Sequence, residues 1–383
     1  MKVLKKLFYS LYALFFNLSR ILPVKKNRIA FVAPHNGGDY DSLGLVRAYA
    51  ESKGVYDIVT ISTRDLKLDF SGLKPLVSSC LKAAGFFTVK AKALATSKYV
   101  FLNDNFMPMA SLKFSPDAVI TQLWHAEGAF KKFGLSAPLT DDVSEREKKC
   151  SERLNYVVCS SKNVAPIYAE AFGVNESKIL PLGAPRIDSL LKERNISEIR
   201  EKFDKKHPEC KGKKLILYAP TFRDDPETDR KILDNIDISA FRRELGDDYR
   251  LLIKLHPQIN SGAKISGTVD VTNGHDINDL TLISDLLITD YSSVCMDFAL
   301  LSKPCIFFAF DLEEYEKERS FYFDYEKYVP GTVAKDFSAV LEAIKNPRND
   351  EEKLHRFRDF NFDYIDCNNT ERIFNTVISA NSQ

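Results

Sequence analysis

The chain has 383 residues, of which 44% are hydrophobic and 28% are charged, and its formal net charge is +1. Because a single hydrophobic core stops growing at roughly 250–300 residues, we expect two cores. The balanced charge excludes bulk disorder and a surface that binds polyanions as a whole, so we expect no nucleic-acid partner.

Residues 1–26 combine lysines and aromatic side chains with a short apolar run. Its uncharged part, residues 7–19, is too short to cross a bilayer, which requires about 20 residues. No small-residue cleavage site follows the run, which argues against a signal peptide. We therefore predict an amphipathic helix that lies on an anionic membrane surface. The alternative is an ordinary amphipathic helix docked on the first domain.

Both halves of the remaining chain alternate short apolar runs with helix-length segments such as 42–53 and 143–154. Such runs are typical of strands buried on both faces of a parallel sheet. In the first half they cover residues 29–34, 56–61, 99–102, 118–122 and 156–159. In the second half they cover residues 214–219, 250–255, 269–272, 286–289 and 305–308. We predict an α/β protein with two doubly wound Rossmann-like domains that face a cleft, joined by a hinge within residues 193–213.

The first polar cluster after a predicted strand contains five candidate side chains: Trp124, His125, Glu127, Lys131 and Lys132. Histidine titrates near neutral pH and can accept a proton from an attacking hydroxyl. A core histidine satisfied by a backbone partner is the alternative, but the glycine and lysines nearby favour a functional site.

Two clusters of the second half carry basic side chains at strand ends. Thr221 and Arg223 follow the first strand of this half, and a planar guanidinium suits phosphate oxygens. Lys254 and His256 end the second strand and project to one face. The alternatives are a surface turn with a salt bridge and a strand end with a solvated lysine.

Polar side chains also gather where a later strand ends and a helix begins, at Thr289, Asp290, Ser292 and Ser293. Hydroxyls and exposed backbone N–H groups at a helix start form a natural phosphate seat, and simple capping without a ligand is the alternative. From the acidic and aromatic stretch that follows, we retain Asp311 and Arg319 as donor-binding candidates.

Together these side chains indicate a nucleotide-diphosphate donor. Neither a P-loop nor a Gly-x-Gly-x-x-Gly fingerprint is present in the sequence, which argues against those nucleotide folds. The seven cysteines form no CxxC pair, which favours reduced thiols over disulfides or a zinc site. We expect no metal and no cofactor, so that basic side chains neutralise the leaving diphosphate.

Five ordered motifs cover residues 122–125, 183–188, 218–223, 254–257 and 289–293. In this order they resemble the CDP-glycerol glycerophosphotransferase family of teichoic-acid primases and polymerases. The resemblance implies a GT-B-like architecture, peripheral attachment to the cytoplasmic face of the cell membrane, and CDP-glycerol or CDP-ribitol as the donor. It also implies a lipid-linked teichoic acid or related cell-surface polymer as the acceptor.

By motif match, His125 is similar to the family's catalytic base and His256 to the histidine near the donor diphosphate. Arg223, Ser292 and Ser293 match positions that hold phosphate or the alditol. The acceptor hydroxyl would attack the β-phosphorus, and CMP would leave.

The chain departs from the family pattern directly after the histidine, where Ala126 and Glu127 replace the usual Gly-Thr. We expect Glu127 to orient His125, to favour the charged imidazolium or to reshape the acceptor pocket beside Trp124. The departure leaves the identity of the alditol and of the acceptor open.

The resemblance also assigns roles to the parts of the chain. We expect an interfacial helix at 1–26, an acceptor-side domain at 27–195, a CDP-donor domain at 196–345 and C-terminal helices at 346–383. The short chain favours a primase-like, single-addition role. Two other functions stay open: a GT-B glycosyltransferase that uses a nucleotide-sugar, and a non-catalytic membrane assembly subunit.

Overall fold

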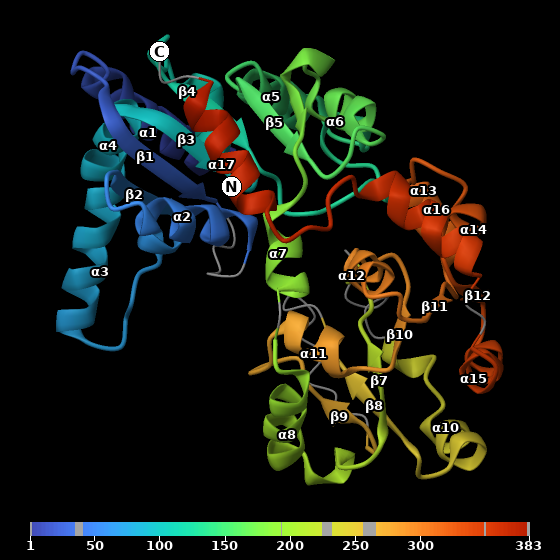
Figure 1. The fold of residues 1–383 in the computed structure, drawn as a ribbon. Coiled ribbons are helices and arrows are strands. Elements are labelled where there is room, and N and C mark those ends of the chain that lie inside the picture. Colours follow the sequence, from blue (N-terminus) through green and yellow to red (C-terminus); the bar gives the residue numbers. More distant parts are fainter. Residues whose placement is uncertain are drawn as a thin grey trace. The chain divides into compact units, whose positions relative to one another are not determined.

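The computed structural model describes residues 2–34, 41–192, 194–223, 232–255, 266–347 and 350–380. Two compact units make up the chain, and Figure 1 shows the helices and strands of each. Unit 1 comprises Met1–Ser189 and Asn361–Gln383, and unit 2 comprises Leu190–Phe360. The last residues of the chain therefore return to the unit in which it begins.

Unit 1 is built on a parallel six-stranded sheet with the order β2-β1-β3-β4-β5-β6. Its strands are β1 (Lys25–Ala33), β2 (Asp57–Ser62), β3 (Ser97–Leu102), β4 (Val119–Gln122), β5 (Tyr156–Cys159) and β6 (Ile179–Pro181). Its helices are α1 (Lys2–Ser19), α2 (Ser42–Ser52), α3 (Leu73–Gly85), α4 (Ala91–Ala95), α5 (Asp141–Ser151), α6 (Ala165–Phe172) and α17 (Asn369–Ser379), and α7 (Pro185–Leu191) crosses the unit boundary. The last five residues of β1 are all buried, because helices cover both faces of the parallel sheet.

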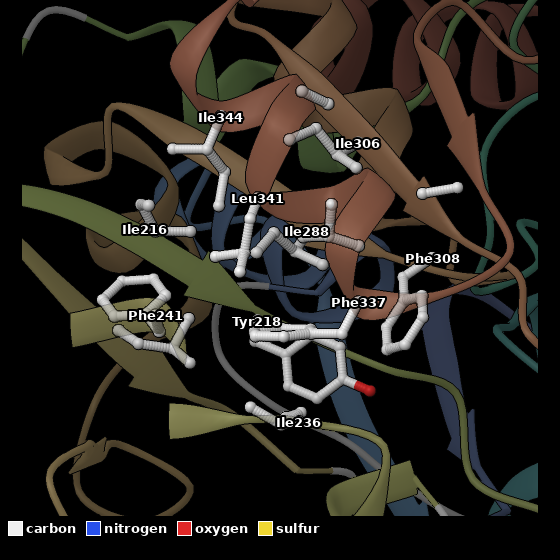
Figure 2. Close-up of a cluster of buried hydrophobic side chains, with 14 of the residues drawn as sticks. Ile216, Tyr218, Ile236, Phe241, Ile288, Ile306, Phe308, Phe337, Leu341 and Ile344 are labelled. Atoms are coloured by element: carbon white, nitrogen blue, oxygen red, sulfur yellow. The ribbon is translucent and has the colours of Figure 1, made fainter. Parts of the chain in front are cut away.

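Unit 2 holds a second parallel six-stranded sheet, with the order β12-β11-β10-β7-β8-β9. Its strands are β7 (Lys214–Tyr218), β8 (Tyr249–Ile253), β9 (Val269–Asp270), β10 (Leu286–Thr289), β11 (Cys305–Phe308) and β12 (Thr332–Ala334). Its helices are α8 (Ile196–Lys206), α10 (Ile238–Leu245), α11 (Ile277–Ile283), α12 (Val294–Leu300), α13 (Leu312–Arg319), α14 (Tyr325–Tyr328) and α15 (Phe337–Lys345), and α16 (Glu351–Asn361) ends at the boundary. Figure 2 shows its core, where Ile216 and Ile288 of the sheet and Leu341 of α15 belong to one buried cluster.

The predicted class, α/β with two doubly wound units and an N-terminal helix, is confirmed. Each apolar run that we expected to form a strand does so, with small shifts at the ends. The structure adds β6 and β12, which have only three residues each. The segment in which we expected a hinge contains α8.

Helix α1 has two apolar sides. Tyr12 and Phe16 are fully buried, and the Tyr12 ring packs against Phe86 and Phe106 with centroid distances of 5.1 and 5.3 Å. A second stripe at helical spacing is 39–62% exposed and consists of Leu7, Leu11, Leu14 and Leu18. The helix is thus docked on unit 1 and still presents leucines to its surroundings. No helix within the described ranges is long and apolar enough to span a bilayer.

The motif at residues 183–188 holds the C-terminal helix α17 in unit 1. The Asp188 carboxylate accepts hydrogen bonds from the Asn369 backbone N–H at 3.0 Å and side-chain amide at 2.7 Å, and from the Thr370 N–H at 2.7 Å. At Gly183, where φ is +97°, a Cβ atom would lie only 1.7 Å from the Asn369 side-chain oxygen. This motif therefore clamps the two chain segments of unit 1 together.

Candidate functional site

The turn after β4 presents His125 to solvent. Trp124 has a φ of +59°, a left-handed conformation that costs a residue with a Cβ about 1–2 kcal/mol. The Gln122 side chain stabilises it, since its oxygen accepts from the Trp124 N–H at 3.0 Å and its amide donates to the Asp104 carbonyl at 3.2 Å. The Trp124 ring stacks on Phe133 with a centroid distance of 5.1 Å. Consequently the His125 ring points outward and its side chain is 50% exposed.

The neighbours of His125 determine which ring nitrogen is available. Nδ1 lies 3.3 Å from the backbone oxygen of Asn103 and 3.8 Å from the Asp104 carboxylate. A carbonyl oxygen can only accept, so Nδ1 carries the hydrogen in this contact and the neutral ring keeps its lone pair on Nε2. An imidazole held in this way presents Nε2 as a proton acceptor, and the Asp104 carboxylate is the charged group beside its other nitrogen. Its catalytic role stays a prediction.

Glu127 has a different partner from the one we expected. Its carboxylate is buried and lies 3.1 Å from the Arg186 guanidinium, whereas the carboxylate beside His125 belongs to Asp104. Lys131 and Lys132 follow on the same segment and are half-buried. Asp104 is a functional candidate that sequence reasoning missed, although the polar stretch right after the strand at 99–102 was a signal for it. Arg186 belongs to the motif at residues 183–188, but its contact with Glu127 was not predicted.

In unit 2 the residue Arg223 is 5% exposed, and its guanidinium lies between two carboxylates. It makes two hydrogen bonds with Asp311, at 2.8 and 3.0 Å, and one with Asp290 at 2.9 Å, and it also donates to the Thr221 carbonyl at 2.7 Å. The Tyr291 hydroxyl donates to Asp311 at 2.9 Å. Burial alone would lower the pKa of Arg223, but the two carboxylates outweigh it and keep that pKa above its usual value.

Four predicted donor-side residues, Thr221, Arg223, Asp290 and Asp311, thus form one buried network. Arg223 uses its N–H groups to bond Asp290 and Asp311. These bonds stabilise the turn that leads into α12. The Thr289 hydroxyl adds a bond of 2.7 Å to the Ala219 carbonyl. Ser292 and Ser293 are only half-buried on this turn, and the Ser293 side chain makes no capping bond to α12. These two residues are the least buried members of the predicted phosphate seat.

Lys254, another predicted donor-side residue, has its own hydrogen-bond partners. The Lys254 ammonium donates to the carbonyls of Thr272 and His275 at 2.9 and 3.1 Å. Burial lowers the pKa of Lys254, and Asp276 opposes this effect. Arg319 is exposed at the end of α13. His256 lies outside the described residues. Across the described part of the chain, no three His, Cys, Asp or Glu side chains group as a metal site.

The two parallel sheets, with polar side chains at their strand ends, define a protein with a GT-B-like fold. The family model described as CDP-Glycerol:Poly(glycerophosphate) glycerophosphotransferase matches residues 14–379. The chain belongs to this family, as its ordered motifs indicated.

Two curated relatives and one solved structure illustrate the similarity. The chain is 33% identical over 383 residues to the teichoic acid poly(ribitol-phosphate) polymerase of Bacillus spizizenii, covering 98% of this chain and 60% of that protein. It is 35% identical over 300 residues to the teichoic acid ribitol-phosphate primase of the same organism, covering 75% of this chain and 76% of the primase. The wall teichoic acid polymerase TagF superposes with a TM-score of 0.77 at 25% identity, covering 98% of this chain and 93% of that one.

Proposed function

We propose that this protein transfers glycerol phosphate or ribitol phosphate from a CDP-alditol to a membrane-linked teichoic acid or a related cell-surface polymer. Family membership supports the reaction class, and relatives named for ribitol phosphate and for glycerol phosphate both align with the chain. A TagF structure soaked with CDPG supports a CDP-alditol donor. The observation that carries the proposal is the exposed His125, whose Nδ1 contact with a carbonyl leaves Nε2 to act as a base.

In the proposed reaction, the acceptor hydroxyl oxygen forms a bond to the β-phosphorus while the bond from that phosphorus to the bridging oxygen breaks. The hydroxyl proton passes to Nε2 of His125, and the electron pair of the broken bond leaves on CMP. Asp104 stabilises the imidazolium, and Ser292 and Ser293 contribute hydroxyl donors to the phosphate oxygens. We also propose that no metal or cofactor takes part, and CMP release that a chelator does not alter would support this.

The direct test incubates the protein with a lipid-linked acceptor and either CDP-glycerol or CDP-ribitol, and measures CMP. We expect release from one or both donors, depending on the acceptor, and loss of release in His125→Gln. Absence of CMP from both donors, with acceptors of both types, would refute the proposed reaction.

We propose further that the protein is peripheral on the cytoplasmic face of the cell membrane. The exposed leucine stripe of α1 supports this attachment, as does a second stripe on α3 formed by Leu73, Val77 and Leu81. Lys5 and Lys6 of α1 are exposed and suit anionic headgroups.

Vesicle sedimentation tests the attachment without unfolding α1. The double variant Leu14→Asn/Leu18→Asn leaves Tyr12 and Phe16 in place, so we expect a folded protein that binds phosphatidylglycerol vesicles more weakly. The matched control is Ile196→Asn, an exposed apolar residue of unit 2. Equal vesicle binding by the double variant and the wild type would contradict the attachment through α1.

A further inference from the structure

Unit 1 contains a cavity of about 230 Å³ at the carboxyl ends of β1 and β2. Two register pairs of these strands line it, Phe31 with Thr60 and Ala33 with Ser62. Residues of one register pair point to the same face of a sheet, and here this face is covered by the first turns of α2. Ligands of doubly wound proteins bind at the carboxyl ends of the strands, and this cavity lies at that end of the sheet.

Two guanidinium groups and one carboxylate line the cavity, from Arg47, Arg64 and Asp65. Arg64 is exposed, and among the described residues its guanidinium has neither an ion pair nor a hydrogen bond. Arg47 lies 3.7 Å from Glu51 in a partly exposed pair one helical turn away. Because Glu51 offsets Arg47, Arg64 is the cation of the lining that is left for a ligand, and the polar strand-end residues adjoin an apolar floor.

Contacts within unit 1 connect this cavity to the proposed base. Asp41 is the N-cap of α2 and accepts from the Gly44 N–H at 2.7 Å, and it also accepts from the Asn103 side-chain amide at 3.3 Å. The Asn103 carbonyl in turn contacts His125. Because adjacent strands lie about 4.8 Å apart, β1 and β2 are about 10 and 15 Å from β4 in the order of the sheet. This separation suits a group that precedes the reacting hydroxyl along an extended acceptor.

We propose that the cavity binds a phosphodiester of the acceptor, located before the terminal hydroxyl that reacts at His125. Arginine forks match two phosphate oxygens at once, and the apolar floor accommodates the alditol carbons. The inference rests on the proposed function, because it assumes an acceptor that already carries an alditol phosphate.

Binding of glycerophosphoglycerol, a soluble phosphodiester, tests the cavity independently of turnover. We expect the wild type to bind it in a calorimetric or NMR titration and Arg64→Gln to bind it about tenfold more weakly, as expected for loss of a hydrogen bond to a charged group. Arg64→Lys keeps the charge without the fork and should fall between them. Lys67→Gln, an exposed cation outside the lining, should bind like the wild type.

Turnover supplies the second measurement. With an acceptor that carries alditol phosphate, Arg64→Gln should raise the acceptor KM about tenfold and leave kcat and the donor KM unchanged. Equal glycerophosphoglycerol affinity in the wild type and Arg64→Gln, or no binding by the wild type, overturns the inference. A wild type that binds this probe but releases no CMP from any CDP-alditol refutes the proposed function and leaves the phosphodiester site standing.

Discussion

Two arginines of this chain have the same charge and opposite surroundings. Arg223 is buried and its guanidinium bonds two carboxylates, Asp290 and Asp311, whereas Arg64 is exposed at the edge of a cavity. A buried guanidinium is stable only because its partners replace the water that it has lost. We therefore expect Arg223 to support the turn before α12, and Arg64 to take part in the ligand binding proposed above.

The substitution Arg223→Gln should lower the free energy of unfolding by about 3–5 kcal/mol, because it leaves buried carboxylates without their cation. Urea unfolding of the variant measures the change. Arg319→Gln, at an exposed position of the same unit, is the control and should change stability little. Unchanged stability together with a raised donor KM in Arg223→Gln would instead identify this arginine as a phosphate ligand.

Substitution of Asp104 should affect catalysis, whereas substitution of Glu127 should affect stability. Asp104→Asn should lower kcat for CMP release roughly tenfold, with little change in KM, because the imidazolium loses its stabilising charge. Glu127→Gln should mainly lower the free energy of unfolding, by about 1–3 kcal/mol, because it weakens the buried bond to Arg186. A larger loss of kcat in Glu127→Gln than in Asp104→Asn would restore the role that the sequence suggested for Glu127.

Among the elements, α17 depends on the clamp at residues 183–188. Gly183→Ala should destabilise unit 1 by about 2 kcal/mol or more, since a positive φ and a close approach to Asn369 combine there. Gly212→Ala is the matched control, because its φ is also positive but nothing lies within 4 Å of the added Cβ. Comparing the thermal unfolding of both variants separates the effect of the clash from that of the backbone strain. An equal decrease in Tm in the two variants would rule out the clash.

A histidine pair joins the end of α8 to the segment before α11. Nε2 of His207 lies 3.0 Å from Nε2 of His275, so one ring must be neutral to accept. Burial, followed by Lys206 and His207, lowers the pKa of His275. The folded state therefore keeps this ring neutral, and its contribution to stability is complete above a pH of about 6.5.

As the pH falls from about 6.5 through the lowered pKa of His275, that contribution is lost, because the unfolded chain binds the proton more readily. Urea unfolding at several pH values should show a free energy of unfolding that decreases toward acid. The decrease should be smaller in His275→Gln, and an identical pH dependence in both proteins would contradict this account.

At the scale of the whole molecule, the two units differ in the number of chain segments that form them. Unit 2 is a single stretch of chain, whereas unit 1 requires residues 361–383. Ile373, Phe374 and Val377 of α17 are buried with Phe31 and Phe101 in one core. We expect a chain that ends at Phe360 to lose protection from hydrogen exchange in the unit 1 sheet and to retain it in unit 2. Retained protection in both units would show that α17 is dispensable.

Local sequence patterns were sufficient to predict most strands of this protein. The apolar runs predicted ten of the strands, because a strand buried on both faces needs a continuous apolar segment. The polar residues after those runs suggested His125 and Ser292 as site residues, and their roles stay predictions. β6 and β12 could not be predicted, since three residues are too few for a periodic signal. The family motifs identified the family but not the partner of each side chain.

Only the tertiary structure showed which side chains are hydrogen-bond partners of one another. Arg223 meets Asp290 and Asp311 across 67 and 88 residues, and Asp188 meets Asn369 across 181. The residue types allow either a ligand-binding arginine or a structural one, because both uses need the same planar fork. Burial and the distance to a carboxylate distinguish the surroundings of the two arginines, and these quantities exist only when distant segments pack together.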